Sequence, residues 1–115
     1  MKSQVAVAAL SALAQESRLA LFRLLVKRGP EGYCAGELAQ RLDIPAPTLS
    51  FHLKTLSQAG LVRSRKASRF VHYSANFDLM SGLVEFLTEH CCSLATDCAG
   101  ATCGAAAPAA RRRAA

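Results

Sequence analysis

The sequence predicts a mainly α-helical domain that carries one small β-hairpin. Near the middle of the chain, Leu49, Leu53, Leu56 and Ala59 recur at spacings of four, three and three, which is typical of the buried face of a short helix. Prolines crowd the start of this helix, where missing N–H groups cost least, and Gly60 follows its end, where a left-handed cap favours glycine. A basic, strand-like segment comes next. A helix, a glycine stop and a basic hairpin in this order are typical of a winged helix-turn-helix.

Length and charge restrict the partners of this domain. The chain has 115 residues, enough for one domain, and 51% of them are hydrophobic, so it can form a core. It carries 14 Lys and Arg against 8 Asp and Glu, a net charge of +6. A basic balance favours a polyanion such as double-stranded DNA. No apolar run approaches the roughly 18 residues of a membrane span, so we expect no membrane association.

The N-terminal segment predicts a first helix from Ser3 to Ala14. Lys2 and the apolar run after it could also be read as a signal peptide. Cleavage after Ala14, however, would release a peptide shorter than the usual signal peptide of about 15–30 residues. The helix is apolar on most sides, so we expect it to be buried all round. The simplest partner for such a surface is a second subunit, which predicts a homodimer.

The remaining elements follow from residues that start or end helices and strands, and from the spacing of apolar residues. We expect a helix over residues 14–27 with Ser17 as its N-cap, a short extended piece at 31–34, a helix at 35–42, a turn at 43–45, the central helix at 46–59, strands at 61–66 and 70–74 around a tip at 67–69, and a last helix at 77–94. Residues 1–98 would form the DNA-binding and dimerisation domain. The Ala-, Gly- and Arg-rich residues 99–115 would be a flexible tail.

The surface expected to bind DNA has two parts. The outer face of the central helix offers Thr48, Ser50, Phe51, Lys54 and Thr55, a mixed polar surface suited to a major groove. The hairpin, or wing, offers Arg63, Arg65, Lys66 and Arg69. These cations could merely be solvated, but their place directly after the helix favours contact with DNA. His52 flanks the leucine face and is expected to pack inside the domain.

Several runs carry a family resemblance. They are Gln15–Leu19, Gly36–Ala39, Thr48–Leu53, Gln58–Val62 and the wing. With them, residues 8–94 resemble the ArsR/SmtB family of metal- and metalloid-sensing winged-helix repressors. The resemblance implies a homodimer with an interface of first and last helices, and a central helix that enters the major groove. Pro45 and Ala46 depart from the family, which has a capping Ser and a base-reading Gln at these places, so no operator sequence carries over.

The cysteines predict a thiol site. Cys34 stands alone, whereas Cys91, Cys92, Cys98 and Cys103 fall within one short segment. A total of five cysteines is odd, and the crowding of four of them does not suit a disulfide framework, which favours reduced thiols, a soft ion and the cytoplasm. Adjacent cysteines also seldom close a relaxed disulfide. We expect Cys91 and Cys92 at the end of the last helix, and Cys34 as a small buried hydrophobe.

The identity of the ion stays open on composition alone. Trivalent arsenic or antimony takes three sulfurs, which Cys91, Cys92 and Cys98 would supply, whereas zinc takes four ligands and would add Cys103 or His90. The founding members of the resembled family have a Cys-x-Cys site at the third helix, and this chain has only Cys34 there. A subgroup with a Cys-Cys pair after the last helix and one more Cys downstream responds to arsenite. The resemblance therefore implies As(III) as the inducer.

Other functions remain as alternatives. The same fold could respond to zinc, to another soft metal or to thiol oxidation. A thiol reductase is a further alternative, but such enzymes carry Cys-x-x-Cys or a cysteine at a helix N-terminus, and the sequence offers no catalytic Ser/His/Asp set. The sequence therefore predicts a repressor and not an enzyme.

Overall fold

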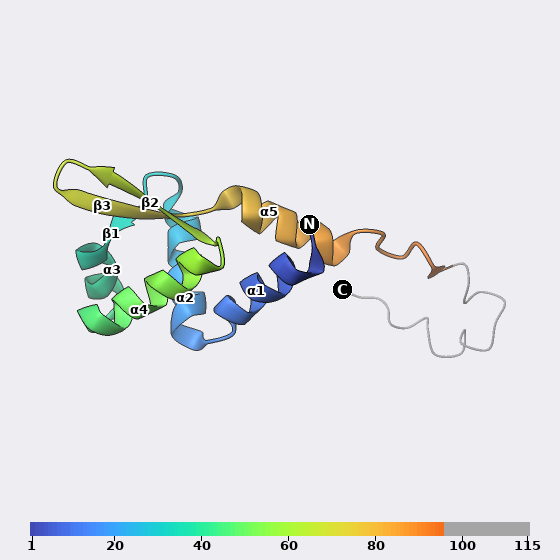
Figure 1. Ribbon diagram of the computed structural model, residues 1–115, viewed down its shortest axis with the longest axis horizontal. Helices are drawn as coiled ribbons and strands as arrows, with labels where there is room; N and C mark the ends of the chain where they lie inside the picture. Colours follow the sequence, from blue (N-terminus) through green and yellow to red (C-terminus); the bar gives the residue numbers. More distant parts are fainter. Residues whose placement is uncertain (96–115) are drawn as a thin grey trace.

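A computed structural model describes residues 1–95 of the chain (Figure 1). Its elements in order are α1 (Ser3–Leu13), α2 (Glu16–Arg28), β1 (Tyr33–Cys34), α3 (Ala35–Leu42), α4 (Ala46–Gln58), β2 (Val62–Ala67), β3 (Phe70–Ala75) and α5 (Phe77–Thr88). This arrangement confirms the predicted winged helix-turn-helix, with α3 and α4 as the helical pair and β2–β3 as the wing. The predicted tail at 99–115 lies outside the described residues.

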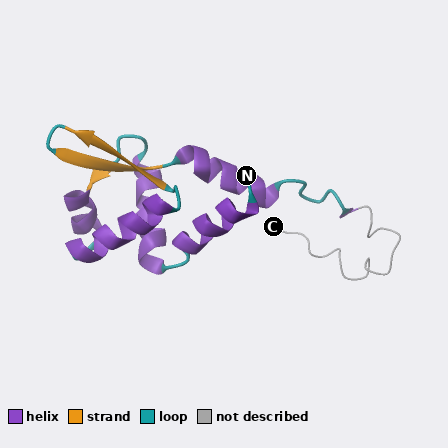
Figure 2. Cartoon of the chain, in the orientation of Figure 1, coloured by secondary structure: helices purple, strands orange, loops and turns teal. Residues whose placement is uncertain are grey.

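The core lies where α2, α3 and α4 pack beneath the sheet (Figure 2). Its largest fully buried side chains are leucines from each of these helices and from the residue before the wing: Leu21, Leu25, Leu38, Leu49, Leu56 and Leu61. Burying one such side chain stabilises a fold by roughly 1.5–3 kcal/mol. The predicted inner face of the central helix is confirmed, because Leu49, Leu53 and Leu56 are all buried.

The sheet is antiparallel and ordered β1-β3-β2. Tyr33 of β1 pairs with Tyr73, and Val62 of β2 pairs with Ala75, so the base of the wing rests on the core. Gly32 leads into β1 with φ +71, and a Cβ there would overlap the carbonyl oxygen of Tyr73. This position therefore requires glycine for both its backbone conformation and its space.

The ends of two helices test the capping predictions. The prediction of Ser17 as N-cap of α2 is wrong, because Gln15, two residues earlier, is the N-cap and the helix begins at Glu16. The Gln15 side-chain oxygen accepts the N–H of Arg18 over 2.9 Å. The glycine cap of α4 is confirmed: Gly60 has φ +84, and Leu61 N–H donates to the Leu56 carbonyl over 3.0 Å.

The last helix is shorter than predicted. It ends at Thr88 instead of residue 94, so Cys91 and Cys92 lie beyond it. Leu83 is the one α5 side chain that is buried in the core, and Leu87 is exposed. The His-Cys-Cys-Ser run from residue 90 has low helix propensity and is exposed, with no core to pack on, so nothing offsets the cost of further helical turns.

The first helix is only partly buried within the single chain. Ala6, Ala9 and Ala12 face the core, whereas Val5, Val7 and Leu10 are 40%, 61% and 41% exposed in the single chain. Within residues 1–95 no single helix has both the length and the apolar composition to cross a membrane; α1 and α2 reach them only together, across a bend of 104°.

Candidate DNA interface and thiol site

The outer face of α4 presents the side chains predicted to contact DNA. Thr48, Ser50 and Lys54 are exposed, and Phe51 is 61% exposed. Thr55 is half-buried, and its hydroxyl donates to the Phe51 carbonyl over 3.1 Å. A hydroxyl bonded to its own helix has less capacity to donate elsewhere. The free polar surface of α4 therefore lies chiefly on its first turns and on Lys54.

The inner face of α4 carries a histidine. Among residues 1–95, His52 is the one polar side chain that is buried, and its Nδ1 has no hydrogen-bond partner. Burial first, and then the charge of Arg18, lowers the pKa of His52 below its usual 6.5. The expectation that this residue packs inside the domain is confirmed.

The wing presents its four cations at the surface. Arg63, Arg65, Lys66 and Arg69 are all exposed. The register pairs Arg63 with Ser74 and Arg65 with His72, so the two arginines share one face of the hairpin. The wing tip and the first turns of α4 lie at the same end of the molecule in Figure 1. The exposed polar side chains of the helix and the cations of the hairpin therefore lie towards one end of the molecule.

Arg63 differs from the other wing cations because it has an acidic neighbour. Its guanidinium lies 3.4 Å from the carboxylate of Asp78 in the first turn of α5. Both side chains are exposed, and such a surface ion pair is worth about 0–1 kcal/mol. Arg63 can therefore exchange Asp78 for a phosphate at little cost.

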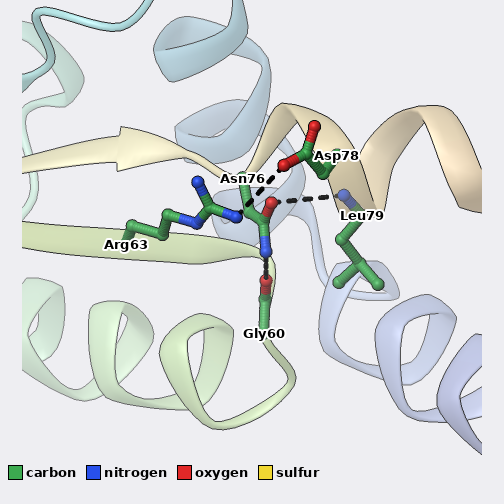
Figure 3. Close-up of polar contacts among 5 residues, drawn as sticks. All are labelled: Gly60, Arg63, Asn76, Asp78 and Leu79. Atoms are coloured by element: carbon green, nitrogen blue, oxygen red, sulfur yellow. Dashed lines mark hydrogen bonds and ion pairs between the residues drawn. The ribbon is translucent and has the colours of Figure 1, made fainter.

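The junction between α4, the wing and α5 was not predicted as a functional feature. Figure 3 shows the side chain of Asn76, the N-cap of α5, held between two neighbours. Its amide donates to the Gly60 carbonyl over 2.8 Å, and its oxygen accepts the N–H of Leu79 over 3.2 Å. The Asn76 N–H also donates to the Leu61 carbonyl over 2.8 Å. An Asn directly before an apolar helix is a capping signal that could have identified this residue.

A second unpredicted cluster surrounds Tyr33. The guanidinium carbons of Arg28 and Arg41 lie 4.8 Å and 4.7 Å from the centre of its ring. Arg28 also pairs with Glu31 and donates to the Gly32 carbonyl over 3.0 Å. This cluster joins the end of α2, strand β1 and the last turn of α3, so it holds the helix-turn-helix against the sheet.

The thiol pair lies beyond α5, at the opposite end of the molecule from the wing tip (Figure 1). Cys91 and Cys92 are exposed free thiols, and their sulfurs are 3.5 Å apart. The hydrogen bond with Cys92, followed by repulsion from its charge, raises the pKa of Cys91 above its usual range. Among residues 1–95, no three His, Cys, Asp or Glu side chains gather as a metal site. Cys98 and Cys103, the other predicted ligands, lie outside the described residues.

Cys34 is half-buried, so it is less buried than the small buried hydrophobe that the sequence predicted. It stands at the N-cap of α3, where its N–H donates to the Glu37 carboxylate over 3.1 Å. Hydrogen bonds from the Cys34 backbone and then from its thiol lower the pKa of Glu37. Cys34 thus belongs to a helix cap and lies far along the chain from Cys91 and Cys92.

Comparison with known proteins agrees with this geometry. A family model described as a helix-turn-helix domain matches residues 13–65. The transcriptional regulator YceK of Bacillus subtilis is 41% identical over 65% of this chain and 74% of its own length. The transcriptional activator HlyU of Vibrio cholerae is 33% identical over 78% of this chain and 81% of its own. The arsenical resistance operon repressor of Escherichia coli is 39% identical, but only over 53% of this chain and 50% of its own.

A solved structure shows the same architecture. The ArsR-like transcriptional regulator from Rhodococcus sp. RHA1 superimposes with a TM-score of 0.73 and 25% identity, over 84% of this chain and 89% of that protein. This chain belongs to the ArsR/SmtB family of winged helix-turn-helix transcriptional regulators.

Proposed function

We propose that this protein is a cytoplasmic, homodimeric repressor that releases its operator DNA when trivalent arsenic or antimony binds Cys91, Cys92 and Cys98. The observation that carries the proposal is the pair of free sulfurs, 3.5 Å apart, just beyond a helix that is hydrogen-bonded to the DNA-binding unit. It supports a binding protein with no catalytic role. The half-length likeness to an arsenical resistance operon repressor agrees with it.

The DNA part of the proposal rests on the surface of α4 and the wing. Exposed Thr48, Ser50 and Phe51 occupy the first turns of α4, where helices inserted in a major groove meet base edges. Arg65, Lys66 and Arg69 would meet phosphates or the adjacent minor groove, which gives affinity and register but little sequence information. Arg63 would join them when it leaves Asp78.

The thiol part rests on the sulfur spacing. Two sulfurs about 2.3 Å from one zinc ion lie about 3.8 Å apart at the tetrahedral angle and about 3.3 Å apart at a right angle. The observed 3.5 Å falls between these values, so Cys91 and Cys92 can bind one ion with little movement. A third thiol, from Cys98, completes the pyramidal set that trivalent arsenic takes. Zinc, which would need a fourth ligand such as Cys103 or His90, is the second candidate.

The junction at Asn76 supports a route from the thiols to the DNA. Cys91 N–H donates to the Thr88 carbonyl over 3.0 Å, so the thiol turn is attached to the end of α5. Asn76 attaches the start of α5 to Gly60, directly after α4. A ligand shifts an equilibrium only by its different affinities for two states. Closure of three thiols on one ion would favour one position of this turn, and α5 would transmit that preference.

The homodimer rests on apolar side chains that the single chain leaves exposed. On α1 they are Val5, Val7 and Leu10, and on α5 they are Val84 and Leu87, which are 57% and 59% exposed. Exposed apolar surface of this extent on two helices is typical of a subunit interface. The family resemblance implies the same two helices.

The test is operator binding measured by fluorescence anisotropy and titrated with arsenite under reducing conditions. A duplex selected by the protein from a randomised pool serves as operator. Cys91→Ser, Cys92→Ser and Cys98→Ser should each bind this duplex normally and fail to release it. Cys34→Ser is the matched control and should release it as the wild type does. Release by the Cys91→Ser protein at the wild-type arsenite concentration would refute the thiol site.

Oxidation of the thiols is the alternative that the reducing conditions test. Adjacent Cα atoms are about 3.8 Å apart across a trans peptide, which is shorter than the usual disulfide span. A Cys91–Cys92 disulfide would therefore be strained, and a redox response would need Cys98 or Cys103 as the partner. Release by an oxidant, but not by arsenite with reductant, would favour the redox response.

A further inference from the structure

The wing carries an aromatic side chain that the proposed function has not used. Phe70 opens β3 and is 59% exposed. Of the five phenylalanines, Phe22 is buried and Phe77 and Phe86 pack against the core, so only Phe51 and Phe70 stand out at the surface. Phe51 lies on the outer face of α4. The two exposed phenyl rings therefore belong to the two elements of the candidate DNA surface.

The position of Phe70 in the hairpin explains its exposure. Its cross-strand partner is Ala67, whose methyl group is too small to cover a phenyl ring. The chain turns back through Ser68 and Arg69 immediately before it, with Ser68 at φ +57, so no further strand pair lies beyond it. Phe70 is thus at the outermost pair of the wing.

The charges around Phe70 favour a polyanion as its partner. Strand alternation puts Phe70 on the face that carries Arg65, two cross-strand pairs closer to the tip. The hairpin from Val62 to Ala75 contains four cations and no acidic residue. A protein surface that buried this ring would also have to accommodate those cations, whereas DNA supplies phosphates beside them.

We propose that Phe70 enters the DNA minor groove beside the major groove that α4 occupies, and partly unstacks one base step. Minor-groove proteins insert apolar wedges such as Phe in this way and bend the duplex. Arg65 and Arg69 would hold the flanking phosphates. Pyrimidine–purine steps are the easiest to unstack, so Phe70 would add a preference for such a step without a hydrogen bond to a base. This inference rests on the proposed DNA binding.

The first test compares side chains at position 70 on a duplex selected by the wild type. Phe70→Ala should lose about 5- to 150-fold in affinity, the range for loss of one stacked base. Its salt dependence should stay unchanged, because no charge is lost. Phe70→Leu, which keeps an apolar wedge, should retain more affinity than Phe70→Ala. Val71→Ala, on the opposite face of the same hairpin, is the matched control and should bind as the wild type.

The second test measures the environment of the side chain at position 70 and the bend of the DNA. The chain contains no Trp, so Phe70→Trp introduces a single tryptophan, whose emission can be excited separately from that of the two tyrosines. Its emission should be quenched when the duplex binds, and energy transfer between dyes at the duplex ends should show a bend that Phe70→Ala reduces. Wild-type affinity and bend in Phe70→Ala, or unchanged Trp emission on binding, would overturn the inference and leave DNA binding intact. A wild-type protein that selects no duplex would instead refute the proposed function.

Discussion

The side-chain amide of Asn76 donates to the carbonyl oxygen of Gly60 over 2.8 Å, and this bond joins the start of α5 to the end of α4 (Figure 3). The same side chain caps α5 through the Leu79 N–H. A Cβ placed on Gly60 would lie 3.4 Å from the Leu79 side chain, so the two segments also approach closely. A displacement of α5 therefore also moves the end of α4 unless this contact breaks.

Replacement of Asn76 should separate stability from signalling. Asn76→Asp keeps an oxygen for the Leu79 N–H but loses the donor to Gly60, whereas Asn76→Ala loses both. We expect Asn76→Ala to cost about 0.5–2 kcal/mol of unfolding free energy, as for other N-caps, and Asn76→Asp less. Both should reduce the ratio of DNA affinities measured without and with arsenite. Ser81→Ala on the exposed surface of α5 is the control, and an unchanged ratio in Asn76→Asp would exclude this bond from transmission.

The contrast between α4 and α5 shows what the sequence can predict. The leucines of α4 repeat over its whole length and Gly60 marks its end, so its buried face and cap follow from local chemistry. The end of α5 depends on where the elements packed against it end, and no local sequence pattern shows this. Exposure of Phe70 likewise depends on its cross-strand partner, Ala67, and hence on the register of the hairpin. Asn76 did carry a local signal, which marks α5's start but not the bond to Gly60.

The two glycines around β1 should respond oppositely to alanine. Gly32→Ala forces a side chain into φ +71 and against the Tyr73 carbonyl, so it should destabilise the domain by more than about 1 kcal/mol. Gly36 lies in α3 with nothing within 4 Å of a Cβ. Gly36→Ala should therefore stabilise by about 0.5–1 kcal/mol through helix propensity. Urea denaturation of both variants measures this, and equal effects would refute the predicted close approach of Gly32.

The helix and the wing should contribute differently to DNA binding. Phe51→Ala or Ser50→Ala should cost roughly 1–3 kcal/mol on the selected duplex and much less on random DNA, because base edges differ between the two. Arg65→Ala should weaken binding to both and reduce the salt slope by about one unit. Anisotropy titrations at several salt concentrations separate these effects. Equal losses on both duplexes for Phe51→Ala would place that side chain on the phosphate backbone instead.

His52 should make stability depend on pH. Its folded pKa lies below 6.5, so the unfolded chain binds a proton more readily than the folded one. The free energy of unfolding should therefore fall as the pH drops below about 6.5 towards the folded pKa. His52→Leu, which keeps the side chain apolar, should flatten this part of the profile. Denaturation of both proteins across about pH 5 to 8 tests it, since the difference between them excludes the other histidines.

Proton release should distinguish arsenic from zinc at the thiol pair. The shared hydrogen bond raises the pKa of Cys91, so this thiol enters the reaction protonated at neutral pH. Arsenous acid, As(OH)₃, and three thiols form three As–S bonds and three waters, with no net proton. Zinc must displace protons, and its affinity rises with pH.

Calorimetry in two buffers of different ionisation enthalpy counts these protons. We expect equal heats for arsenite in the two buffers and buffer-dependent heats for zinc. Cys92→Ser should weaken both, since it removes one sulfur of the pair. Tight zinc binding that releases the operator, with no heat from arsenite, would assign the site to zinc, because ligands spaced for a tetrahedral ion would not close on a three-sulfur pyramidal centre.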